Sequence, residues 1–120
     1  MLLSLVLLAG TTLLTPTRPA VVAVAVQASE ASSSAAQAEI DAGLAAFRRL
    51  RFQQAEKHFQ AAVEADPQSA AATFYLAYTV YKIAEPKRPF HPDKQRAAQL
   101  FARAYELDPG FRPVWARSTP

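Results

Sequence analysis

The chain has 120 residues, no cysteine, and three more Lys and Arg than Asp and Glu. This length leaves room for one small domain. Without cysteine, the chain has no disulfide framework, no thiolate nucleophile and no Cys-ligated metal. The charged residues of both signs are interspersed, so composition does not predict a strongly electrostatic partner such as nucleic acid.

The N-terminal segment, residues 1–28, predicts export. Residues 2–14 and 20–26 are largely apolar, and Arg18 stands between them with a proline on each side. A single membrane span over this segment would bury Arg18 at a cost of about 2.5–3.5 kcal/mol. Small residues at 23–25 and 26–28 suit signal peptidase. We therefore expect a cleavable signal peptide and a periplasmic or secreted protein, with an uncleaved membrane anchor as the alternative.

The rest of the chain predicts a linker and four helices. Residues 29–38 are small and polar without an apolar period, which is typical of a flexible linker. Apolar residues then recur at helical intervals, and prolines mark the boundaries. We expect helices over about 36–50, 53–65, 69–85 and 92–107, with Ser69 as an N-cap and Pro92 in a first turn. A short helical stub is expected around 113–116.

One spacing occurs twice. Residues 55, 59, 62, 66 and 67 are Ala, Phe, Ala, Asp and Pro, and residues 97, 101, 104, 108 and 109 repeat them at the same intervals. Small and aromatic residues at these intervals let two helices pack closely, which predicts tandem helical hairpins. The residues expected to pack the hairpins are Gly43, Ala55, Phe59, Ala62, Pro67, Ala77, Ala97, Phe101, Ala104 and Pro109.

This pattern resembles the tetratricopeptide repeat (TPR) family over residues 36–116. Repeat 1 would cover 36–67 and repeat 2 would cover 68–109, with 110–120 as a cap or tail. Phe47 and Tyr81 are 34 residues apart, the TPR period, whereas Phe59 and Phe101 are 42 apart, so we expect an insertion at 85–93. Leu50 stands where the family usually has a turn glycine. The resemblance implies an all-α, α-solenoid-type fold of two hairpins with a truncated C-terminal stub.

The resemblance also implies a function, because TPR proteins often hold a partner's peptide or helix on the inner face of the array. The expected groove residues are Ile40, Leu44, Phe47, Arg48, Phe74, Tyr78, Tyr81 and Lys82. The alternative is that several of these rings are core in so small an array. Leu44 and Tyr78 replace the asparagines of the clamp that binds C-terminal carboxylates in some TPR proteins, which disfavours such a ligand. Since two repeats are fewer than usual, we expect Phe111 and Trp115 to cap the fourth helix, or else self-association or completion by a partner.

Other functions have weaker sequence support. The segment 47–52, FRRLRF, fits a solvated helix end, and the alternative is a basic accessory subunit that binds nucleic acid. A membrane-tethered structural subunit of an envelope complex is a further alternative. His58 and His91 are far apart in the sequence, and no glycine-rich phosphate loop occurs. We therefore expect no catalytic residue, no metal and no cofactor, and an interaction module rather than an enzyme.

Overall fold

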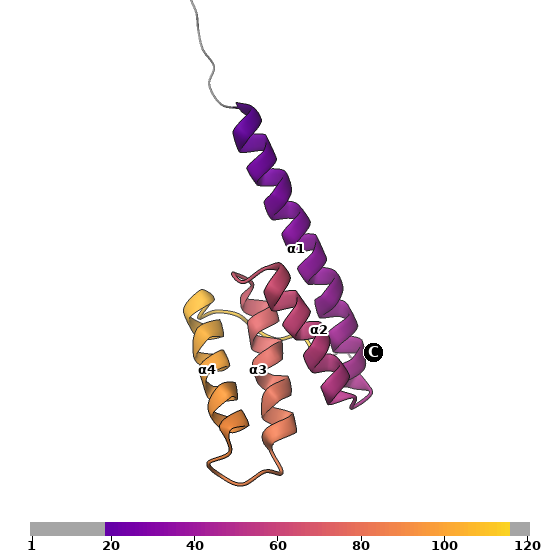
Figure 1. Ribbon diagram of the computed structural model, residues 1–120, viewed down its shortest axis with the longest axis vertical. Helices are drawn as coiled ribbons and strands as arrows, with labels where there is room; N and C mark the ends of the chain where they lie inside the picture. Colours follow the sequence, from indigo (N-terminus) through magenta and orange to yellow (C-terminus); the bar gives the residue numbers. More distant parts are fainter. Residues whose placement is uncertain (1–18, 116–120) are drawn as a thin grey trace, which may run out of the picture.

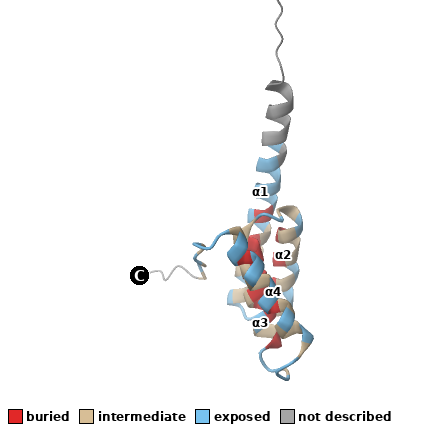
Figure 2. Cartoon of the chain, turned by 90° about the vertical axis from the view of Figure 1, so that its left-hand side faces the viewer, coloured by how far each residue is buried: buried red, intermediate tan, exposed pale blue. Residues whose placement is uncertain are grey.

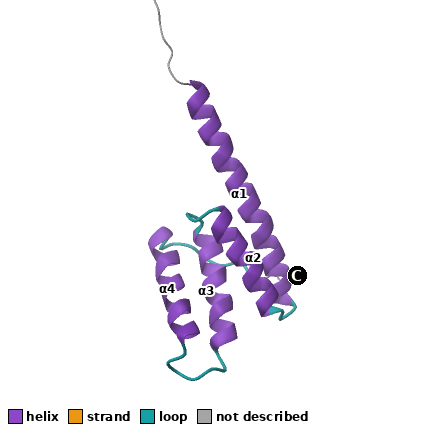
Figure 3. Cartoon of the chain, in the orientation of Figure 1, coloured by secondary structure: helices purple, strands orange, loops and turns teal. Residues whose placement is uncertain are grey.

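The computed structural model describes residues 19–115. The helices are α1 (Pro19–Arg48), α2 (Phe52–Ala65), α3 (Ala70–Ala84) and α4 (Pro92–Leu107) (Figure 1). No strand occurs among the described residues (Figure 3), which confirms the all-α prediction. Residues 1–18 of the predicted signal peptide or anchor, and residues 116–120 of the predicted tail, lie outside the described part.

Helix α1 is much longer than the sequence pattern predicts. It includes residues 29–38, so the prediction of a flexible linker there is wrong. These residues are mostly Ala and Ser with no Gly or Pro, and Ala favours a helix more than any other residue. Residues 29–35 face solvent, and Ala36 is the first buried side chain described (Figure 2). The apolar period is missing because this part of the helix is exposed, not because it is unstructured. Within residues 19–115, no helix combines the length and apolarity needed to cross a membrane.

The turn between α1 and α2 has a left-handed residue. Leu50 has a φ of 60°, a conformation that a Cβ makes unfavourable. Its amide donates to the Phe47 carbonyl at 2.9 Å, and the Arg51 amide donates to the Ala46 carbonyl at 3.0 Å, which closes the end of α1. Position 50 therefore has the backbone geometry of a turn glycine although the residue is leucine.

Helices α3 and α4 begin at the residues that the sequence predicts. The Ser69 Oγ accepts a hydrogen bond from the Ala72 amide at 3.1 Å, which confirms the N-cap. Pro92 is the first residue of α4, and His91 Nδ1 accepts a hydrogen bond from the Asp93 amide at 3.1 Å. Local capping therefore fixes both helix starts.

The helices pack as two successive hairpins. Helix α1 packs against α2, α3 packs against α4, and α2 packs against α3 to join the pairs. Phe59 of α2 is fully buried, and its ring stacks on Tyr75 of α3 with the centroids 5.5 Å apart. The small residues expected at helix contacts are all buried: Gly43, Ala55, Ala62, Ala77, Ala97 and Ala104. Phe101 is half-buried, whereas Pro67 and Pro109 are exposed beyond the helix ends.

The loop between α3 and α4, residues 85–91, is ordered by local polar contacts. Lys87 Nζ donates to the Asp93 carboxylate at 2.6 Å, and Lys94 Nζ donates to the Lys87 carbonyl at 2.6 Å. The hydrogen bond from Lys87 holds the pKa of Asp93 below its ordinary value. Phe90, in contrast, is 87% exposed at the tip of the loop.

Candidate functional site

Four rings from α1 and α3 gather on one side of the hairpins. Phe74 and Tyr78 are one helical turn apart on α3, so both project to the same side, and Tyr75 lies beside them. Phe47, near the end of α1, completes the group, with its centroid 5.8 Å from that of Tyr78. We call Phe47, Phe74, Tyr75 and Tyr78 the aromatic face.

After α4 the chain returns to the aromatic face. Residues 111–115, which we call the return segment, have no regular secondary structure and run across α3 toward α1 (Figure 1). The predicted helical stub is therefore wrong for residues 113–115, and Ala116 lies outside the described part. Pro113 disfavours helical geometry at Arg112. The two rings of the return segment reach different parts of the face, Phe111 at Phe74 and Trp115 at Phe47.

These two rings fill the aromatic face from α3 to α1. The Phe111 centroid lies 5.4 Å from that of Phe74. The Trp115 centroid lies 4.7 Å from Tyr78 and 4.9 Å from Phe47, with Phe47 stacked on the indole. Such aromatic pairs contribute about 0.5–1.5 kcal/mol each beyond their buried area. The return segment therefore covers part of the face with the chain's own side chains.

Tyr75 is the residue of this site that the sequence analysis missed. It is only 4% exposed, and its hydroxyl accepts a hydrogen bond from the Val114 amide at 2.8 Å. Its ring contacts both Phe111 and Trp115. The sequence feature that could have identified Tyr75 is its position three residues before Tyr78, which places both rings on one helix face.

The structure brings together only part of the predicted groove. Phe47, Phe74 and Tyr78 belong to the aromatic face, where the return segment covers them in part. Ile40 is buried in the core, and Leu44 packs against that core. The apolar half of the predicted groove is therefore divided between the core and a face that already has an occupant.

The other groove residues form an edge. Tyr81 is 44% exposed, and its ring centroid lies 6.0 Å from that of Tyr78. Lys82 forms an ion pair with Glu85 at 3.1 Å, and this hydrogen bond raises the pKa of Lys82. Arg48 is exposed, and its Nε donates a hydrogen bond at 3.2 Å to the Leu44 carbonyl of the same helix. Tyr81 is thus the exposed aromatic side chain of the predicted groove.

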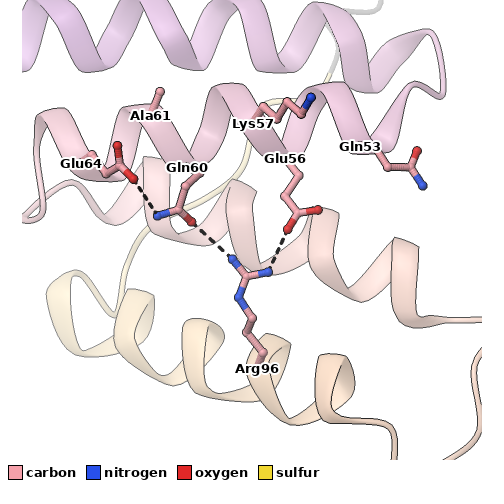
Figure 4. Close-up of a pocket in the computed structure, with 7 residues that line it drawn as sticks. All are labelled: Gln53, Glu56, Lys57, Gln60, Ala61, Glu64 and Arg96. Atoms are coloured by element: carbon pink, nitrogen blue, oxygen red, sulfur yellow. Dashed lines mark hydrogen bonds and ion pairs between the residues drawn. The ribbon is translucent and has the colours of Figure 1, made fainter.

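A polar hollow of about 560 Å³ lies between α2 and α4 (Figure 4). Arg96 of α4 reaches into it and donates to Glu56 at 2.8 Å and to Gln60 at 3.3 Å. Gln60 in turn donates to Glu64 at 3.4 Å. Glu56 and Glu64 balance the charges of Lys57 and Arg96, and hydrogen bonds join Arg96, Glu56, Gln60 and Glu64 in one chain. The contacts of Arg96 therefore link α4 of the second hairpin to α2 of the first.

The basic cluster at residues 48, 49 and 51 lies where α1 ends and α2 begins. Arg48 is in the last turn of α1, where a cation interacts favourably with the helix dipole. Arg49 and Arg51 are exposed and line a small hollow of about 220 Å³ with His58. This placement agrees with a solvated helix end.

Both histidines have structural partners. His58 Nδ1 lies 2.8 Å from Glu39 Oε2, which ties α2 to α1. His91 caps α4. Among residues 19–115, no three His, Asp or Glu side chains are grouped so that they could hold a metal ion.

The described residues form an all-α fold of two packed helical hairpins whose aromatic face receives the return segment. Comparison of the chain with family models, with characterised proteins and with solved structures finds no match. Assignment to a repeat family and to a function therefore depends on the residues and contacts of the chain itself.

Proposed function

We propose that this chain is an exported TPR-type adaptor that binds a peptide or helix of a partner protein through its aromatic face. Two features support the TPR assignment: the successive hairpins, and the burial of Ala55, Phe59 and Ala62 at their contacts. The observation that carries the binding function is the aromatic face, whose edge residue Tyr81 is 44% exposed.

Aromatic side chains suit such a role on physical grounds. They bury a large area while few torsions become fixed, and they are enriched among residues that dominate binding energy. Tyr78 is half-buried and Tyr81 is exposed beside it. An apolar side chain of a partner placed against this pair would exclude water from both rings.

The test is capture of partners from an envelope fraction by the purified chain. We expect Tyr81→Ala to lose a partner that the wild type captures, with helical circular dichroism unchanged. Phe90→Ala is the control, because Phe90 is an aromatic side chain that is 87% exposed in the loop between α3 and α4. If both Tyr78→Ala and Tyr81→Ala retain every partner, the proposal is wrong. Loss of helix in both variants would show that the rings serve packing.

The proposed export depends on the sequence of residues 1–28. Mass spectrometry of the protein purified from cells tests it. An N-terminus at Val26 or Ser29 supports a cleaved signal peptide, and retention of residues 1–28 supports the membrane-anchored alternative.

A further inference from the structure

The return segment occupies the aromatic face as a bound peptide would. Its backbone is neither helix nor strand, and its first and last residues, Phe111 and Trp115, place their rings on the face. Arg112 and Val114 between them are exposed, the latter to 59%. Recognition of the segment therefore depends on two aromatic side chains four positions apart.

Few other contacts hold the return segment in place. Within the described residues, its one hydrogen bond to a helix joins the Val114 amide to the Tyr75 hydroxyl. The Phe111 amide bonds only to Asp108, in the turn that follows α4. Trp115 and Phe111 remain partly exposed. The segment lies on the surface of the hairpins, where aromatic contacts hold it, and it is not part of the helical core.

We propose that the partner of the aromatic face is an extended segment with two aromatic side chains four residues apart, and that it binds by displacing the return segment. This inference rests on the proposed function, because it specifies the ligand of the same face. Two ligands of the same chemistry cannot occupy these rings together. The return segment therefore acts as an internal competitor that sets the affinity for the partner.

The size of this competition follows from mass action. The apparent dissociation constant equals the intrinsic constant divided by the fraction of molecules whose face is open. A tethered segment has an effective concentration in the millimolar range, so it competes strongly with a free ligand. Removing the two rings of the return segment should therefore strengthen binding of a free peptide by about tenfold or more.

The first experiment uses a fluorescein-labelled peptide with the sequence of residues 110–115, GFRPVW, and fluorescence anisotropy. We expect Phe111→Ala/Trp115→Ala to bind it about tenfold or more tightly than the wild type. Arg112→Ala/Val114→Ala is the matched control, because both side chains are exposed, and it should bind as the wild type does. A peptide with alanine at both aromatic positions should bind none of these proteins.

A second measurement uses the intact wild-type chain and its single tryptophan, Trp115. A tryptophan-free peptide, with Phe in place of Trp, should shift the Trp115 emission to the red and increase its quenching by acrylamide. Unchanged emission at millimolar peptide would overturn the displacement. Loss of helix in the double variant would also overturn it, because the segment would then be essential core. A wild-type dimer would identify a second copy as the occupant and contradict a separate partner.

The two proposals fail in different ways. If a captured partner depends on Tyr81 but leaves Trp115 emission unchanged, the proposed function stands and the displacement is wrong. If the aromatic peptide displaces the segment but no partner depends on Tyr81, the proposed adaptor function is wrong.

Discussion

Gly43 of α1 lies directly against the ring of Phe59 of α2. A Cβ at position 43 would stand 2.5 Å from Phe59 Cε1 and 2.8 Å from Cζ, well inside van der Waals contact. Phe59 is fully buried and stacks on Tyr75. The ring therefore cannot move aside, and the missing side chain at position 43 allows α1 and α2 to approach.

We expect Gly43→Ala to destabilise the fold by about 1–3 kcal/mol, because the added methyl group overlaps a ring that is packed on all sides. This loss should exceed the gain of about 1 kcal/mol that Ala has over Gly within a helix. Urea unfolding followed by circular dichroism measures the difference. Gly110→Ala is the control, because a Cβ there would meet only Asp108 Oδ1 at 3.5 Å. A higher unfolding midpoint for Gly43→Ala would show that the two helices can separate without loss.

Leu50→Gly should stabilise the protein. The left-handed conformation at φ 60° costs an L-residue about 1–2 kcal/mol, and Leu50 is 73% exposed, so few contacts would be lost. Glycine also has more freedom in the unfolded chain, which reduces the net gain to about 1 kcal/mol. Leu50→Ala keeps the Cβ and should give no gain in the same unfolding assay. Equal midpoints for both variants would show that position 50 is not strained.

The Lys87–Asp93 pair should make stability depend on acid pH. Because the folded pKa of Asp93 is lowered by the hydrogen bond from Lys87, the pair stabilises the fold above the unfolded pKa of the carboxyl group. That contribution is lost as the pH falls below about 4 and through the folded pKa. We expect Asp93→Asn to unfold at lower urea than the wild type at pH 5, and the difference to shrink at pH 3. A difference of the same size at both pH values would contradict this origin.

Regular helices with strong local signals could be predicted from the sequence. Ser69 and Pro92 act within one turn of their own helices, so short-range capping fixes where α3 and α4 begin. Phe59 recurs at a helical interval from Ala55, and this spacing identified a buried position.

Two features were not predicted, one for a local reason and one because it depends on the tertiary structure. Residues 29–38 are rich in Ala, which favours a helix, but they lack an apolar period, and the absence of a period predicted a linker. The path of the return segment depends on rings from α1 and α3 that are distant from Trp115 in the sequence. The local sequence pattern therefore predicted a helical stub at this position, whereas the contact of Trp115 with Phe47 favours a non-helical crossing of α3.

The hydrogen bond between the Val114 amide and the Tyr75 hydroxyl holds the return segment, but it does not join the helices to one another. Tyr75→Phe keeps the ring that stacks on Phe59 but removes the oxygen that accepts the Val114 amide at 2.8 Å. A net hydrogen bond contributes about 0.5–1.5 kcal/mol, and water can replace this one because Val114 is exposed. We therefore expect a loss near the lower limit, confined to the return segment.

Acrylamide quenching of Trp115 should consequently increase in Tyr75→Phe, while the free energy of unfolding measured from the helical signal changes by less than about 1 kcal/mol. Tyr105→Phe, at an exposed position on α4, should change neither measurement. Unchanged quenching in Tyr75→Phe would mean that ring contacts alone hold the segment. A surface segment that opens independently does not change the global unfolding transition. If the urea midpoint of the helical signal falls while quenching rises, the segment and the helices unfold as one cooperative unit.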